Sequence, residues 1–216
     1  MTEFPSQEVI VDAILKGISN AAENFLSWTN GRLFLSHGPH KIISIHVAQE
    51  IAKIENAPEI FIDATISDIL KCSLDNREAY TSYMENQKLS QDLFNITLDE
   101  RFDHINDEDS ISKVIITVKN SVRNAKLEYT NDIEKICKML DRNKGSKLEY
   151  GIFSFYSDLS TNARKKLTKR IPELINSFNV VVKKYPLLNS KFVCSDIKTI
   201  EGSGEWLMGC FIIEHK

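Results

Sequence analysis

Residues 101–120, RFDHINDEDSISKVIITVKN, constrain the fold of this chain more than any other segment. They combine a short apolar-polar stretch around Asp103 with the apolar run of residues 114–118, which leads into Lys119. The acidic stretch between them is rich in Asn, Asp and Ser, the residue types that favour hairpin loops. The segment therefore predicts two neighbouring strands of one sheet, with Asp103 and Lys119 at neighbouring strand ends.

The rest of the chain adds further helix-like and strand-like patterns. The predicted helices cover residues 7–27, 41–54, 131–140 and 160–184, and a shorter one ends near Cys72. The other predicted strands cover residues 59–66, 148–156, 187–197 and 206–214. This order predicts an α/β fold with a mixed sheet of roughly five or six strands flanked by helices. Since no repeat or low-complexity linker is present, we expect a single domain over residues 1–216, with residues 1–35 as an N-terminal helical extension.

The composition favours a soluble protein of the cytoplasm. The 216 residues carry a net charge of −3, which argues against a protein that coats nucleic acid non-specifically but permits a local basic groove. The four cysteines lie far apart without a CxxC pair, so we expect buried thiols in a reducing compartment. The polar start of the chain does not resemble a secretory leader, and no apolar run is long enough to span a membrane. We therefore expect a cytoplasmic protein without a membrane partner.

Asp103 and Lys119 supply two of the three groups that a metal-dependent nuclease needs. Such a site holds Mg²⁺ with carboxylates and places a lysine beside the reacting phosphate. The usual second carboxylate, two residues before the lysine on the same strand face, is replaced here by Thr117. The structural alternative is that Asp103 and Lys119 are ordinary surface charges at strand ends, since such pairs occur in most domains.

The same segment resembles the core of PD-(D/E)XK nuclease-like proteins, and most of all a group of poorly characterised bacterial proteins. Residues 102–103 are similar to the xD element of that core, and residues 115–120, IITVKN, to its IIEVKN element. Residues 132–140 are similar to the helix that follows, and the later residues 150–156 and Trp206 also match, so that the likeness covers roughly residues 36–214. The resemblance implies a restriction-endonuclease-like core over residues 36–216, with a role in a bacterial defence or competition system.

The resemblance also assigns roles to single residues, and two departures from it matter. It implies that Asp103 binds Mg²⁺ and that Lys119 orients the attacking water, whereas Thr117 lacks the expected charge. The upstream helix begins with His40 or Lys41 where the similar proteins have a glutamate. In some members of the superfamily the acid lies on the neighbouring helix, which makes Glu134 a candidate metal ligand. The alternative is that Glu134 forms an ordinary i,i+4 ion pair with Lys138. The resemblance therefore implies a nuclease-like fold with an impaired active site.

A basic stretch near residue 165 is the candidate surface for DNA or RNA. Its members are Arg164, Lys165, Lys166, Lys169 and Arg170. Along one helix they would form a stripe that contacts phosphates, and the alternative is a solvated amphipathic face. The flanking acids Asp158 and Glu173 weaken the positive field of the stretch.

Three functions follow from these observations. The first is a catalytically impaired nuclease-like protein that binds DNA or RNA. The second is a non-catalytic module on the same scaffold that binds a protein partner, such as an immunity or regulatory protein. The third is an active, divergent Mg²⁺-dependent endonuclease. The first two need no cofactor, and only the third needs Mg²⁺.

Overall fold

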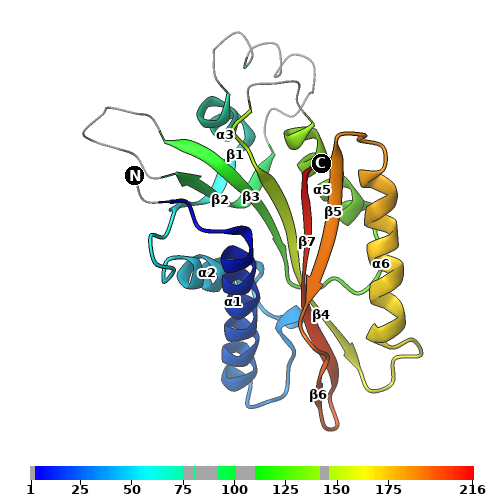
Figure 1. The fold of residues 1–216 in the computed structure, drawn as a ribbon. Helices are drawn as coiled ribbons and strands as arrows, with labels where there is room; N and C mark the ends of the chain where they lie inside the picture. The colour runs from blue at the N-terminus through cyan, green and yellow to red at the C-terminus, as the bar shows by residue number, and fades with distance from the viewer. Residues whose placement is uncertain (1–2, 75–79, 81–91, 101–109, 142–145) are drawn as a thin grey trace.

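The computed structural model describes residues 3–74, 80, 92–100, 110–141 and 146–216 (Figure 1). The helices in this part of the chain are α1 (Gln7–Trp28), the 3₁₀ turn η1 (Leu35–His37), α2 (His40–Ile51), α3 (Ile66–Ser73), α5 (Leu127–Leu140) and α6 (Leu167–Val182). The strands are β1 (Glu59–Thr65), β2 (Leu93–Glu100), β3 (Ile111–Lys119), β4 (Tyr150–Ser160), β5 (Leu188–Cys194), β6 (Lys198–Ile200) and β7 (Gly204–His215). They form one mixed sheet, which confirms the predicted α/β fold.

The strand order explains how the chain places its most apolar segments at the centre. Neighbouring strands run in the order β1-β2-β3-β4-β7-β5, and β6 also pairs with β7. All pairs are antiparallel except β3 and β4, which are parallel. A parallel pair needs a long crossover, and α5 supplies it. Within the described residues the sheet has seven strands, more than we expected, because the three-residue β6 gives no recognisable period in the sequence.

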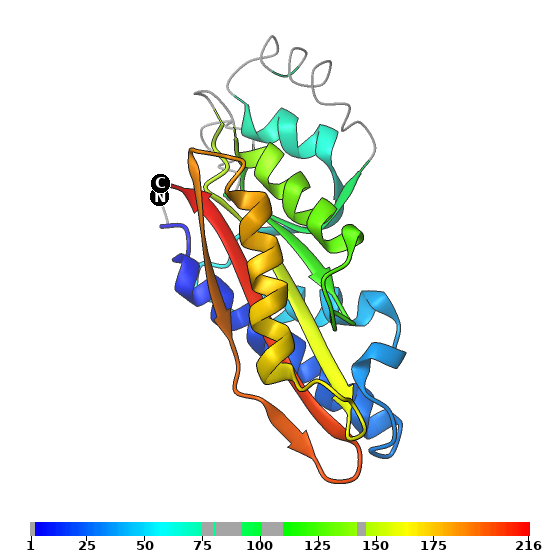
Figure 2. The ribbon, with the colours of Figure 1, turned by 90° about the vertical axis from the view of Figure 1, so that its right-hand side faces the viewer.

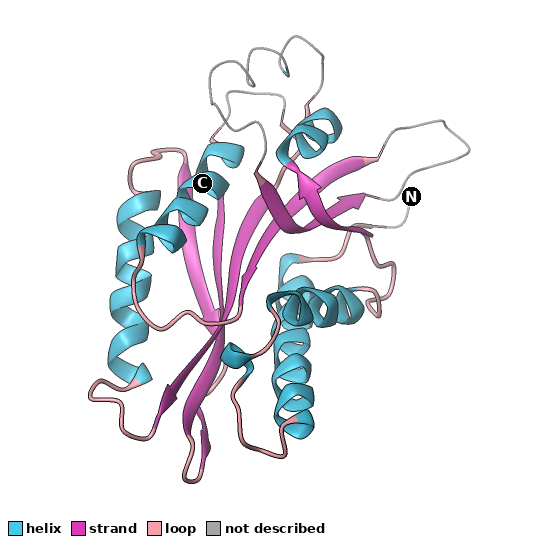
Figure 3. Ribbon diagram, turned by 180° about the vertical axis from the view of Figure 1, so that it is seen from behind, coloured by secondary structure: helices cyan, strands magenta, loops and turns pink. Residues whose placement is uncertain are grey.

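Helices cover both faces of this sheet, so that β3 is buried on both sides (Figures 2 and 3). Ile115 packs in the hydrophobic cluster that contains residues of α3, α5 and α6. Its neighbour Ile116 packs in the second cluster, which contains residues of α1 and α2. Burial on both faces accounts for the unbroken apolar run in this strand. The segment predicted as an N-terminal extension thus supplies α1 to one of the two cores.

Only Lys169 and Arg170 of the basic stretch lie in α6, and residues 164–166 precede it, so the predicted helix over residues 160–184 is wrong at its start. Strand β4 continues to Ser160, which pairs with Gly204 of β7, and α6 begins only at Leu167. The Leu167 backbone N–H donates to Glu205 Oε1 at 2.6 Å, which satisfies one of the free donors at the helix start. Pro172 lies within α6 and does not split it.

The cysteines only partly match the prediction of buried thiols. Cys137 and Cys210 are buried, Cys72 is half-buried, and Cys194 is exposed. Cys194 is the last residue of β5, which lies at the edge of the sheet, and this position explains its exposure. Among the helices of the described residues, none is long and apolar enough to cross a membrane.

Candidate functional site

Lys119, the predicted catalytic lysine, is held by two acids of α5. Its Nζ lies 2.9 Å from Asp132 Oδ2 and 3.0 Å from Glu128 Oε1. The two acids are four residues apart and therefore share one face of the helix. Burial acts to lower the pKa of Lys119, but the contacts with Asp132 and Glu128 outweigh it and raise the pKa. The lysine is therefore protonated at neutral pH, and its charge is balanced by its neighbours.

Two strand positions near Lys119, Thr117 of β3 and Asn95 of β2, carry neutral side chains. Thr117 is 3% exposed, and its hydroxyl has no hydrogen-bond partner among the described residues. On the neighbouring strand, the Asn95 side-chain oxygen accepts a hydrogen bond from the Val118 backbone N–H at 2.8 Å. The β2–β3 pairing stops at Ile96 and Ile116, so Asn95 continues the ladder with its side chain. Sequence analysis missed Asn95 because its place beside β3 depends on the register of β2.

The predicted metal ligand Asp103 lies outside the described residues. The described strand ends on either side of it, Glu100 and Ile111, pair with each other. They mark the start of β3, whereas Lys119 is the last residue of that nine-residue strand. A strand of this length spans about 26 Å at roughly 3.3 Å per residue. The last described residue of β2 thus lies beside the start of β3, at the opposite end of that strand from Lys119, and the placement of Asp103 beside Lys119 stays a prediction.

Glu134, the second candidate ligand, forms the ordinary helix ion pair. Its Oε1 lies 3.7 Å from Lys138 Nζ, and Glu134 is not among the partners of Lys119. Sequence analysis missed the true partners, Glu128 and Asp132, although an acid pair at i,i+4 after the lysine strand was a readable signal. Across the described part of the chain, no group of three or more His, Cys, Asp or Glu residues could hold a metal ion. The two carboxylates described beside Lys119, those of Asp132 and Glu128, are both paired with its ammonium group.

The five basic residues predicted to bind phosphate divide into two groups. Three have local partners: Lys165 pairs with Glu173, Lys166 Nζ donates to the Thr161 carbonyl at 3.2 Å, and Arg170 donates to backbone carbonyls. Arg164 and Lys169 are exposed, and the described residues offer their side chains no partner. The predicted stripe is thus reduced to two free cations beside the start of α6.

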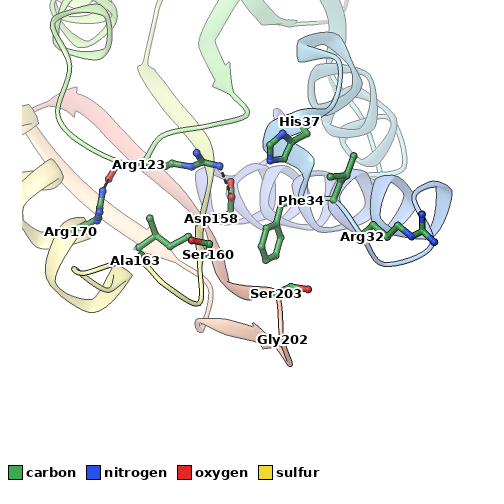
Figure 4. Close-up of a pocket in the computed structure, with 12 residues that line it drawn as sticks. Arg32, Phe34, His37, Arg123, Asp158, Ser160, Ala163, Arg170, Gly202 and Ser203 are labelled. Carbon is green, nitrogen blue, oxygen red and sulfur yellow. Dashed lines mark hydrogen bonds and ion pairs between the residues drawn. The ribbon is translucent and has the colours of Figure 1, made fainter.

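Arg170 also lines a pocket of about 580 Å³ at the far end of β4 (Figure 4). Strand β3 ends at Lys119, whereas its neighbour β4 continues to Ser160. Residues 121–124 lie along the edge of β4 that β3 leaves uncovered, and the Val122 N–H donates to the Tyr156 carbonyl at 3.0 Å. The other described lining residues are Arg32, Leu33, Phe34, His37, Arg123, Asp158, Leu159, Ser160, Ala163, Gly202 and Ser203. Arg123 Nη2 lies 2.7 Å from Asp158 Oδ2, and it also donates to Ser36 Oγ at 2.9 Å. The pocket thus joins four separate segments of the chain, which is why sequence analysis did not find it.

By its fold, the chain is an α/β protein with a mixed seven-stranded sheet between two helical layers. Comparison with protein-family models, with curated proteins and with solved structures found no match for it.

Proposed function

We propose that this chain is a nuclease-like protein that binds DNA or RNA without cleaving it. The ion pairs of Lys119 with Asp132 and Glu128 are the observation that carries the proposal. A nuclease lysine acts on the attacking water or on the charge that develops at the phosphate. Here two carboxylates neutralise this lysine, and their negative charge repels a phosphate that approaches it.

The neutral positions beside Lys119 support the same proposal. Metal-assisted cleavage needs carboxylates that hold Mg²⁺ close to the lysine. The Asn95 side chain instead accepts a hydrogen bond from the Val118 backbone N–H, and the Thr117 hydroxyl is buried and neutral. Neither side chain therefore offers a negative charge to a metal ion. The antiparallel β1–β2–β3 run, followed by α5 and the parallel β4, is compatible with the nuclease-like scaffold that the sequence resemblance implies.

Binding of nucleic acid is proposed for the free cations Arg164 and Lys169. Both are exposed at the start of α6, where the helix dipole also favours anions. A protein with a net charge of −3 gains only limited long-range attraction to nucleic acid. We therefore expect weak binding that falls steeply as salt is added.

A cleavage assay tests the first half of the proposal. The protein is incubated with plasmid DNA, single-stranded DNA and RNA in the presence of Mg²⁺ or Mn²⁺. We expect no more product than with the Lys119→Ala variant. Metal-dependent cleavage that Lys119→Ala abolishes would show instead an active, divergent Mg²⁺-dependent endonuclease.

Fluorescence anisotropy with labelled DNA and RNA tests the second half. We expect the double variant Arg164→Ala/Lys169→Ala to weaken binding and to reduce the salt slope by about 1 to 2 units, since each lost phosphate contact contributes roughly 0.7 to 0.9. The double variant Lys183→Ala/Lys184→Ala is the matched control, because both lysines are exposed at the other end of α6. Equal losses in the two variants, or no binding at low salt, would contradict the proposal.

One observation favours a second function, that of a non-catalytic module that binds a protein partner. Phe61 and Ile62 of the edge strand β1 are each 46% exposed, and exposed apolar residues on a sheet edge often mark a protein interface. A stoichiometric partner that co-purifies from the native host and is lost in Phe61→Lys would support this function. Recovery of no such partner counts against it.

A further inference from the structure

The pocket beside Arg123 contains polar atoms that the protein leaves without partners. Asp158 is 1% exposed, yet its Oδ1 accepts no hydrogen bond from the described residues, and the buried Arg123 Nε donates none to them. Buried polar atoms are nearly always paired, because an unpaired one loses its hydrogen bonds to water without replacement. The ion pair with Arg123 uses only Oδ2 of the carboxylate. A molecule in the pocket that donates a hydrogen bond would satisfy Oδ1.

The charges of the residues that line the pocket favour an anionic ligand. Three arginines line it, Arg32, Arg123 and Arg170, against the single carboxylate of Asp158. Arg170 is fixed by hydrogen bonds from Nε to the Lys165 carbonyl at 2.9 Å and from Nη1 to the Arg123 carbonyl at 3.4 Å. It has no acidic partner among the residues that the structure describes, so its charge is free. Nη1 also donates to Asn124 Oδ1, so Nη2 is the part of this fixed guanidinium that can donate to a phosphate.

The volume and the aromatic lining narrow the class of ligand. A volume of about 580 Å³ suits a small organic molecule rather than a lone inorganic ion. Figure 4 shows Arg123 and Arg170 on one side of the view and Arg32 on the other, with the Phe34 ring between them. An aromatic ring beside cations is a common binding site for a nucleobase, because every nucleobase has a flat face that can stack on the ring.

We propose that this pocket binds a 5′-nucleotide. Arg170, with Arg123, binds the phosphate, Asp158 Oδ1 accepts a hydrogen bond from the sugar or the base, and Phe34 stacks on the base. Two sources share this chemistry: a free nucleoside 5′-monophosphate and the phosphorylated 5′ end of a nucleic-acid strand. The proposal does not rest on the impaired nuclease site, since it involves neither Lys119 nor the acids of α5.

Calorimetric titration of the full chain separates the two sources. The probes are adenosine 5′-monophosphate, a short DNA oligonucleotide with a 5′ phosphate, the same oligonucleotide without it, and inorganic phosphate. We expect saturable binding of the monophosphate or of the phosphorylated oligonucleotide, and at least tenfold weaker binding of the other two probes. Binding of the monophosphate identifies a free nucleotide as the ligand, and binding of the phosphorylated oligonucleotide alone identifies a strand end.

Two variants locate the binding in the pocket. We expect Arg170→Gln to weaken it about tenfold or more, whereas Lys184→Gln, which removes the same charge at an exposed position beyond the other end of α6, changes it less than twofold. Ser160→Glu is the second test, because Ser160 is exposed on the pocket wall and its replacement adds a negative charge without removing a side-chain hydrogen bond. We expect a loss similar to that of Arg170→Gln.

Three results would overturn the proposal: no saturable binding of any nucleotide probe at millimolar concentration, inorganic phosphate that binds as tightly as the nucleotides, or equal effects of Arg170→Gln and Lys184→Gln. None of them depends on whether the protein cleaves nucleic acid, so failure here is distinct from failure of the proposed function.

Discussion

At the scale of single residues, Glu50 shows how one buried carboxylate joins two helices. Its side chain is 4% exposed, and it pairs with Lys53 of its own segment and with Lys16 of α1, whose Nζ lies 2.8 Å away. Asn20 of α1 also donates to it at 2.9 Å. The hydrogen bonds from Lys16 and Lys53 lower the pKa of Glu50 to about 2. The charge is thus stable in a buried position because cations from two directions surround it.

This pKa predicts a pH-dependent contribution to stability. An acid with a lowered pKa stabilises the folded state fully above its unfolded value of 4.5, and this contribution is lost as the pH falls from 4.5 towards 2. We expect Glu50→Gln to lower the melting temperature at pH 7, and the difference from the parent protein to shrink steadily below pH 4.5. Thermal unfolding at pH 7, 5, 4 and 3 measures it. Glu55→Gln, at an exposed position, is the control, and a pH-independent effect of Glu50→Gln would contradict the prediction.

Thr117 gives a second prediction at this scale. If one missing acid were the only defect of the nuclease site, Thr117→Glu would create a metal site. We expect instead no heat of binding with Mg²⁺ or Mn²⁺, because Asn95 remains neutral and Lys119 stays paired with the acids of α5. We also expect a loss of stability of about 1–3 kcal/mol, since the new carboxylate replaces a side chain that is 3% exposed. A clear metal-binding heat in this variant would show that the site lacks only one residue.

At the scale of secondary-structure elements, glycines set how closely neighbours approach. A Cβ atom added at Gly17 of α1 would lie 2.5 Å from Val47 Cα of α2. The two helices therefore touch backbone to backbone at this point. At Gly151 of β4, an added Cβ would lie 2.3 Å from the Ile136 side chain of α5. A side chain can rotate away, but a backbone cannot, so the α1–α2 contact tolerates less change.

Gly17→Ala is therefore expected to destabilise the protein. Alanine has the higher helix propensity by about 1 kcal/mol, but the clash with the α2 backbone forces the helices apart and costs more. We expect a net loss of about 1–3 kcal/mol in the free energy of unfolding, measured by urea denaturation. Ser27→Ala lies on the exposed side of the same helix and should be neutral or slightly stabilising. Equal stabilities for the two variants would contradict the close contact.

The sequence predicted the helices and strands better than it predicted the candidate site. The periods of α1, α2 and β4 are local properties, and the sequence revealed them. The site was harder, because the contact of Lys119 with Glu128 depends on α5 starting at Leu127, four residues before the predicted start. The position of Asn95 beside Val118 depends on the register of β2 against β3, and no local sequence pattern determines that register. The pocket depends on contacts such as that between Arg123 and Ser36, which lie 87 residues apart.

At the scale of the whole molecule, one sheet joins two hydrophobic cores. Ile14 of α1 belongs to the cluster on one face, and Phe178 of α6 belongs to the cluster on the other. Both side chains are completely buried, and adjacent residues of β3 reach into both clusters. The two cores share one sheet, and each covers one apolar face of it. If either core lost its helices, the face that they cover would be exposed to water. The molecule should therefore unfold as one unit.

This expectation predicts the behaviour of two truncations on opposite faces. Ile14→Ala should cost about 2–5 kcal/mol and Phe178→Ala about 3–5 kcal/mol. Each variant should still show a single transition, at the same denaturant concentration whether followed by far-ultraviolet circular dichroism or by tryptophan fluorescence. The fluorescence reports on the α1 side of the molecule, since Trp28 is the last residue of α1 and Trp206 of β7 packs in the same cluster as α1, whereas circular dichroism reports on the helices of both faces. If residues 1–35 were an independent extension, Ile14→Ala would melt α1 in an early transition and leave the signal of Trp206 unchanged. We expect instead that α1 melts together with the rest of the molecule and that the signal of Trp206 changes in the same transition, because α1 packs in the same hydrophobic cluster as Trp206.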